Sequence, residues 1–174
     1  PLRRSAPPSS FAASAINDSS RWSRATVAAP VMASIRRRFD PMDDSLEMGT
    51  VIDEAAAKNF EARVNDAVSR GAKLLVGNVR RGAVYSPTVI DHVDPAMDVV
   101  RTETFGPVSP VIRFRDIDHA IAIANGTAYG LSSAVCTNRL DYVTRFVREL
   151  NVGTVNVREV PGYRLELTPF GGIK

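Results

Sequence analysis

The sequence predicts an α/β fold in which helices flank a mostly parallel sheet. Segments with apolar residues at helical spacing alternate with short apolar segments of strand length, and the connections between them are short. In addition, 174 residues with 44% hydrophobic and 24% charged side chains are enough for one globular domain with a core. Strands that alternate with helices are typical of βαβ units, in which the strands run parallel.

The first two predicted helices lie in the N-terminal half. Residues 27–38 end in a basic turn shortly before Pro41, which fits a helix C-terminus. Residues 53–70 carry the clearest helical pattern, with Glu54 in the first turn and Gly71 after the last. The predicted buried face of this helix consists of Ala56, Phe60, Val64, Ala67 and Val68.

Two further helices and five strands are predicted after it. Residues 116–125 form a helix with Asp116 as its N-cap and Gly126 after its end. The last helix, residues 140–150, has an apolar face of Val143, Phe146, Val147 and Leu150. The predicted strands are residues 74–76, 84–90, 108–114, 131–137 and 154–157.

Residues 1–25 differ from residues 26–174, which we take as the folded domain. Serine, alanine, proline and arginine dominate the first segment without apolar periodicity, so we expect it to be disordered. The composition fits a frameshift product or gene remnant, a targeting segment, or a basic arm for phosphate contacts. Residues 1–39 carry a net charge of +6 and residues 40–174 carry −3. Because the folded part is slightly acidic, we expect no nucleic-acid partner.

Several other classes of site are disfavoured. No stretch approaches the roughly 20 apolar residues of a membrane-spanning helix, so we expect no membrane partner. One cysteine (Cys136) and two histidines (His92 and His119) form no metal-binding motif, and no metal ligand is assigned. A single cysteine fits a reducing compartment, and we expect a cytoplasmic location.

Six short blocks follow one another from about residue 30 to the end of the chain. They are Gly49–Asp53 (GTVID), Tyr85–Val89 (YSPTV), Glu103–Pro107 (ETFGP), Asn125–Ser132 (NGTAYGLS), Gly153–Val157 (GTVNV) and Pro169–Lys174 (PFGGIK). In this order and spacing they resemble the aldehyde dehydrogenase family. The resemblance implies an incomplete catalytic domain, the C-terminal part of such an enzyme. Residues 159–169 resemble the phosphonoacetaldehyde dehydrogenase branch, with lactaldehyde dehydrogenase-like members close to it.

The resemblance implies oxidation of an aldehyde to a carboxylate with NAD or NADP. That chemistry uses a cysteine nucleophile, donors to an oxyanion and a carboxylate base. The Gly-x-x-Cys loop of the family is not found in this sequence, and we expect Cys136 to be a buried structural residue of the strand 131–137. No catalytic residue is therefore assigned, and the chain alone is expected to be inactive. The alternative is a non-catalytic relative with an assembly or interaction role.

Three binding residues follow from the resemblance. Glu103 is implied to accept hydrogen bonds from the nicotinamide ribose, and Phe105 to pack beside the nicotinamide ring; a surface acid and a core aromatic are the alternatives. With most of the cofactor site absent, we expect weak or no binding of NAD or NADP. Arg164 is the candidate contact for a phosphonate or carboxylate, with an ion pair to Glu159 or Glu166 as the alternative. The parent enzyme is expected to bind a small-molecule aldehyde and to form a homo-oligomer.

Overall fold

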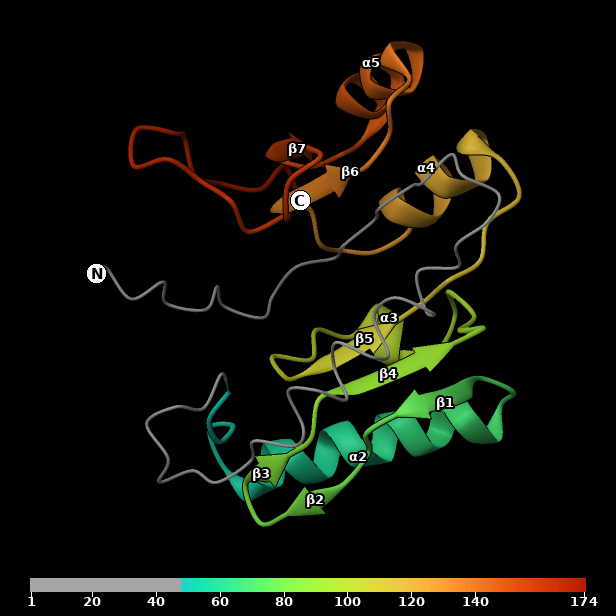
Figure 1. Ribbon diagram of the computed structural model, residues 1–174, viewed down its shortest axis with the longest axis vertical. Helices are drawn as coiled ribbons and strands as arrows, with labels where there is room; N and C mark the ends of the chain where they lie inside the picture. Colours follow the sequence, from blue (N-terminus) through green and yellow to red (C-terminus); the bar gives the residue numbers. More distant parts are fainter. Residues whose placement is uncertain (1–47) are drawn as a thin grey trace. The chain divides into compact units, whose positions relative to one another are not determined.

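The computed structural model describes residues 48–174, which divide into two units, residues 48–113 and residues 114–174 (Figure 1). The α/β class predicted from the sequence is confirmed in both units. The predictions for residues 1–25 and for the helix 27–38 lie outside the described residues. Among residues 48–174, no helix is long and apolar enough to cross a membrane.

The first unit opens with helix α2 (Glu54–Ser69), close to the predicted bounds. The Asp53 side chain caps it by accepting a hydrogen bond from the Ala56 amide at 2.7 Å, and Gly71 follows its end with φ of +105°. Its fully buried residues are Ala57, Phe60, Val64 and Ala67. The predicted face was therefore wrong at Val68, which is 38% exposed, because the buried stripe is narrower than the apolar pattern.

The strands of this unit form a three-stranded sheet and a small hairpin. The sheet has the order β1 (Lys73–Val76), β4 (Thr88–Asp91), β5 (Val108–Pro110), and the hairpin consists of β2 (Arg80–Arg81) and β3 (Val84–Tyr85). The predicted strand 84–90 is thus two strands, interrupted at Ser86 and Pro87. A proline has no amide hydrogen to donate to a strand ladder, which explains the interruption.

The pairing of the strands is mixed rather than mostly parallel. β4 pairs with β5 in parallel, whereas β1 pairs antiparallel with β4 and β2 antiparallel with β3. A parallel pair needs a crossover connection, usually a helix. Between β1 and β4 the chain forms only the β2–β3 hairpin, so the two strands run in opposite directions.

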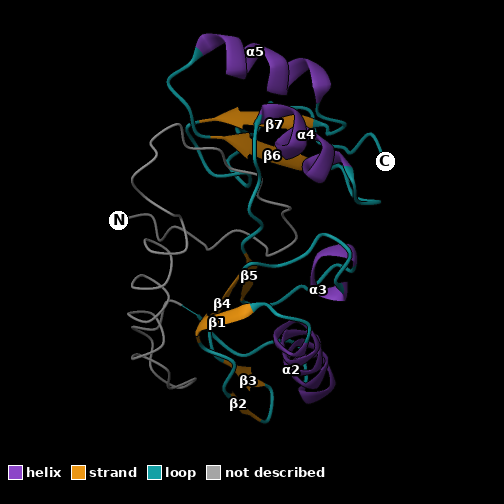
Figure 2. Cartoon of the chain, turned by 90° about the vertical axis from the view of Figure 1, so that its right-hand side faces the viewer, coloured by secondary structure: helices purple, strands orange, loops and turns teal. Residues whose placement is uncertain are grey.

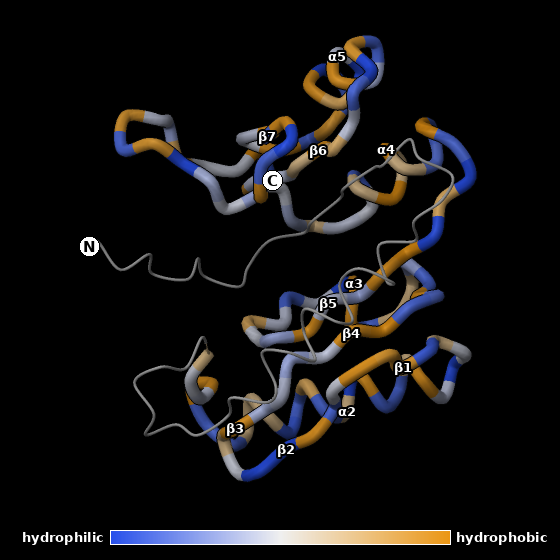
Figure 3. The backbone as a smooth tube through the Cα atoms, viewed as in Figure 1, coloured by the Kyte–Doolittle hydropathy of each residue, from blue (hydrophilic) through white to orange (hydrophobic). Residues whose placement is uncertain are grey.

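The core of the first unit lies between the sheet and its helices. Figure 2 shows α2 and the short helix α3 (Asp98–Arg101) on the same side of the sheet. Buried side chains from α2, β4 and α3 form one cluster, which consists of Val64, Ala67, Ala72, Ile90, Val93, Met97 and Val99. A second cluster of Ala57, Phe60 and Tyr85 lies between α2 and β3. On the outer strand β1, which is hydrophobic in Figure 3, Leu74 and Leu75 remain about 40% exposed.

The second unit contains α4 (Ile117–Asn125), β6 (Ser132–Val135), α5 (Leu140–Glu149) and β7 (Thr154–Val157). β6 and β7 run parallel with α5 between them along the chain, which is the βαβ connection predicted from the sequence. Asp116 caps α4 as predicted, accepting a hydrogen bond from the His119 amide at 2.8 Å. The core consists of Ala120, Ile121, Val135, Phe146 and Leu150. On α5 the prediction was wrong for Val147, which is 55% exposed.

Candidate functional site

The Glu103–Pro107 motif lies in the loop that joins α3 to β5, residues 102–107, which we call the 102–107 loop. Both of its ends are attached to regular structure. The Thr102 amide donates to the Asp98 carbonyl of α3 at 2.9 Å. The Thr88 amide of β4 donates to the Pro107 carbonyl at 2.8 Å, next to the Thr88–Val108 pair of the β4–β5 ladder. The positions of α3 and the sheet therefore fix where the loop starts and ends.

Helix α2 supports the middle of the loop at two points. Gly106 lies on the Phe60 ring, so that a Cβ atom at this position would be 2.5 Å from Phe60 Cε2. Arg63 Nη1 donates a hydrogen bond to the Glu103 carbonyl oxygen at 2.9 Å. Residues three apart on a helix face the same way, so Phe60 and Arg63 reach the loop together. A side chain at residue 106 would require the buried Phe60 ring to move, which favours glycine there.

The aromatic side chain of Phe105 is held in an exposed and strained position. Its φ is +44°, in the left-handed region, and its side chain is 62% exposed. This backbone conformation costs about 1–3 kcal/mol for a residue other than glycine, and exposure forgoes about 1.5–3 kcal/mol that burial of a phenylalanine would give. The interpretation of Phe105 as a core residue is therefore wrong. Backbone strain and an exposed ring in one residue are features that concentrate at ligand sites.

Glu103 and Phe105, the two residues predicted to contact the nicotinamide end of a dinucleotide, lie two positions apart in this loop. Glu103 is half-buried and its backbone is anchored by Arg63. A carboxylate here offers two oxygen acceptors for ribose hydroxyls, and the exposed ring two residues later offers an apolar face for a planar heterocycle.

Tyr85 is a packing residue next to Phe60. Its ring contacts Phe60 edge to face, with 5.8 Å between the ring centroids and 71° between the planes. Burial raises the pKa of Tyr85 to about 12. Its hydroxyl is hydrogen-bonded to Asn78 Oδ1 at 2.6 Å. Tyr85 is therefore neutral at physiological pH and supports the Phe60 ring, on which Gly106 lies.

Arg164 belongs to the second unit, in the segment that follows β7. Its guanidinium carbon lies 4.3 Å from the centre of the Phe170 ring, and the side chain is exposed. Among the described residues it forms no ion pair with Glu159 or Glu166. The ion-pair alternative is thus not supported, and a guanidinium stacked on an aromatic ring keeps its donors available in the plane.

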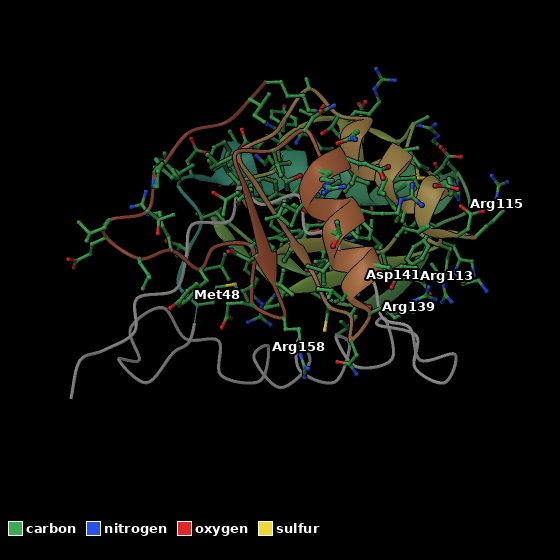
Figure 4. The ribbon with its side chains drawn as sticks, turned by 90° about the horizontal axis from the view of Figure 1, so that it is seen from above. Met48, Arg113, Arg115, Arg139, Asp141 and Arg158 are labelled. Atoms are coloured by element: carbon green, nitrogen blue, oxygen red, sulfur yellow. The ribbon has the colours of Figure 1, made fainter. Side chains whose placement is uncertain are left out.

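Asn156 of β7 orders the turn that leads to Arg164. Its Nδ2 atom donates to the carbonyl oxygens of Val160, Pro161 and Tyr163 at 2.9, 3.1 and 3.1 Å. Arg158 has a left-handed φ of +57° and donates to Asn138 Oδ1 at 2.9 Å. Figure 4 shows Arg158 near the end of β7, and it shows Arg139 beside its ion-pair partner Asp141, 2.6 Å away, at the start of α5.

The structure corrects the expectation for Cys136. The thiol is exposed rather than buried, and the residue lies one position after the end of β6. Val135 and Thr137 on either side are buried, and the side chain of Cys136 between them is exposed. Among residues 48–174, no group of three His, Cys, Asp or Glu side chains is placed to hold a metal ion.

Glu103 and Phe105 were predicted from the sequence as cofactor contacts, whereas the residues of α2 that contact their loop, Phe60 and Arg63, were not assigned that place. The structure brings both residues into the 102–107 loop of the first unit, whereas Arg164 lies in the second unit. The role of Arg63 was not foreseen, although its spacing of three from Phe60 is a signal that both face the same side.

Comparisons with known proteins agree with the motif. Residues 23–174 match the model of the aldehyde dehydrogenase family. The chain is 37% identical over 135 residues to sulfoacetaldehyde dehydrogenase of Neptuniibacter caesariensis, covering 78% of this chain and 30% of that protein.

Two solved structures share the fold. Aldehyde dehydrogenase 21 of Physcomitrella patens, in complex with the reaction product succinate, has a TM-score of 0.80 and 31% identity over 92% of this chain and 33% of that chain. A glyceraldehyde-3-phosphate dehydrogenase of Methanocaldococcus jannaschii, complexed with NADP, has a TM-score of 0.79 and 31% identity over 92% of this chain and 35% of that chain. The chain thus spans about a third of the length of these proteins. Because the family model matches most of its length, the chain belongs to the aldehyde dehydrogenase family.

Proposed function

We propose that this chain supplies the nicotinamide side of the active site of an NAD(P)-dependent aldehyde dehydrogenase. The observation that carries the proposal is Phe105, an exposed aromatic ring with a left-handed backbone in a loop anchored at both ends. A fold retains such strain where the surroundings hold it and a ligand uses it. When bound, NAD or NADP accepts the hydride that leaves the aldehyde.

In this proposal Glu103 and Phe105 position two different parts of the cofactor. The Glu103 carboxylate accepts hydrogen bonds from the ribose hydroxyls, and the Phe105 ring supports one face of the nicotinamide. Both act by fixing the orientation of the ring that reacts, an effect that is worth many powers of ten in rate. Neither residue transfers a proton in the reaction.

The substrate class proposed is a short aldehyde with an anionic group, such as phosphonoacetaldehyde. Arg164 offers paired donors to a phosphonate, sulfonate or carboxylate. The names of the three similar proteins support this class, because they refer to a sulfonate, a carboxylate product and a phosphate. The Arg164 guanidinium lies on the Phe170 ring and forms no ion pair with Glu159 or Glu166. A substrate anion therefore does not have to displace either of these carboxylates.

We also propose that the chain alone does not turn over an aldehyde. Its one cysteine, Cys136, is not part of a Gly-x-x-Cys loop, and it lies at the end of β6 in the second unit. The alternative proposal, a non-catalytic relative with an assembly role, predicts no response of the 102–107 loop to cofactor.

The test is a nuclear magnetic resonance titration of the isotope-labelled chain with millimolar NAD⁺. Amide signals of Thr104, Phe105 and Gly106 are expected to shift, and Glu103→Gln is expected to abolish most of the shift. Glu166→Gln removes an exposed carboxylate elsewhere and serves as the matched control. Loop signals that ignore NAD⁺, or that respond equally in both variants, would contradict the proposed cofactor role.

A further inference from the structure

We infer that Arg63 is the positioning residue of the 102–107 loop. It holds Glu103 where its carboxylate accepts hydrogen bonds from the ribose of the cofactor. The inference rests on the proposed function of the 102–107 loop. It concerns a residue outside the Glu103–Pro107 motif, 40 positions earlier in the sequence and on a different element.

The first step of the argument is the contact itself. Arg63 Nη1 donates to the Glu103 carbonyl oxygen at 2.9 Å, and the contact is partly buried. A charged donor forms a stronger hydrogen bond than a neutral one. The contact therefore fixes the peptide unit directly after the Cα atom from which the Glu103 carboxylate projects.

The second step is what else holds this part of the loop. Thr102 and Pro107 are hydrogen-bonded through their backbone to α3 and β4, and Gly106 lies on Phe60. Arg63 contacts the peptide between Glu103 and Thr104, which is the stretch immediately before the strained Phe105. Without Arg63, rotation of that peptide would move both the carboxylate and the ring.

The third step is that Arg63 has few competing partners. Among the described residues it takes part in no ion pair, whereas Arg70, two turns further along α2, pairs with Asp66 at 3.4 Å. Arg63 is half-buried and Arg70 is exposed. Removing either arginine changes the net charge equally, so Arg70 provides a matched control on the same helix.

The experiment compares Arg63→Met, Arg63→Lys and Arg70→Met in the same labelled chain, first without ligand and then with NAD⁺. Without ligand, Arg63→Met is expected to shift the Glu103 carbonyl carbon and the Thr104 amide nitrogen, which flank the lost hydrogen bond. With NAD⁺, its affinity is expected to fall about tenfold, which corresponds to 1.4 kcal/mol. Arg63→Lys retains a donor and should recover part of this loss, and Arg70→Met should match the unsubstituted chain.

The outcomes separate the two proposals. If the unsubstituted chain does not respond to NAD⁺, the proposed function fails and this inference fails with it. If the unsubstituted chain responds and Arg63→Met binds equally well, the positioning role alone is overturned. Should Arg63→Met not fold, Arg63→Gln replaces it, because glutamine keeps a high helix propensity while its shorter amide does not reach the Glu103 carbonyl.

Discussion

Asp91 is a buried carboxylate at the end of β4, and its side chain is 5% exposed. Burial opposes its ionisation, but hydrogen bonds from the Arg113 guanidinium and the His92 amide outweigh burial and lower the pKa of Asp91 below its usual value. Arg113 contacts both carboxylate oxygens, at 3.1 Å and 2.5 Å. Such a two-point contact is stronger than a surface ion pair. The pair ties the end of β4 to the chain that follows β5.

Stability is therefore predicted to depend on pH through this pair. A carboxyl with a lowered pKa stabilises the folded state above its unfolded pKa, about 3.9, and this contribution is lost as the pH falls through the folded pKa. At neutral pH, Arg113→Met should reduce the free energy of unfolding by about 1–3 kcal/mol. Below pH 4 the difference from the unsubstituted chain should shrink, because protonation removes the unpaired charge.

Urea unfolding at a series of pH values measures this difference. Arg81→Met, which removes an exposed arginine of β2, serves as the control and should change stability little at any pH. A destabilisation by Arg113→Met that is the same at pH 7 and pH 3 would show that the ion pair is not its cause.

At the scale of elements, the features predicted correctly are those that depend on residues close together in the chain. The cap at Asp116 and the strand Thr154–Val157 agree with the structure. The two-residue strand β2 was missed, because two residues cannot display an alternating pattern. The antiparallel β1–β4 pair could not be predicted, since it depends on contacts between strands distant in sequence.

At the candidate site, too, contacts between residues distant in the sequence could not be predicted. The Glu103–Pro107 motif pointed to the 102–107 loop as the candidate site, because its residues are contiguous in the chain. The contact from Arg63 joins residues 40 apart, and the exposure of Phe105 depends on its backbone angle; neither is visible in a local pattern. The outward turn of Cys136 follows from where β6 ends, and strand boundaries are poorly determined by sequence.

The turn after β7 gives a prediction at this scale. Asn156→Ala removes the amide that donates to the three carbonyls of Val160, Pro161 and Tyr163. Because the turn is near the surface, the cost should be about 1 kcal/mol, with faster hydrogen exchange confined to residues 158–164. Exchange followed residue by residue checks this. The control is Asn59→Ala on the exposed side of α2; equal protection of the turn in both variants would contradict the anchoring role.

At the scale of the whole molecule, the candidate binding groups are distributed over two units. The 102–107 loop belongs to residues 48–113, and the candidate anion contact Arg164 belongs to residues 114–174. The chain spans about a third of the length of its relatives. We propose that these two groups of residues bind cofactor and substrate.

The proposal that the chain alone does not oxidise an aldehyde is tested most directly by measuring turnover with the purified chain. NAD⁺ or NADP⁺ is mixed with phosphonoacetaldehyde, sulfoacetaldehyde or lactaldehyde, and formation of the reduced nicotinamide is followed at about 340 nm. We expect a rate equal to that of the protein-free mixture, because no positioned thiolate adds to the aldehyde before hydride transfer. Turnover that is abolished by Cys136→Ala would contradict it and would make Cys136 the nucleophile.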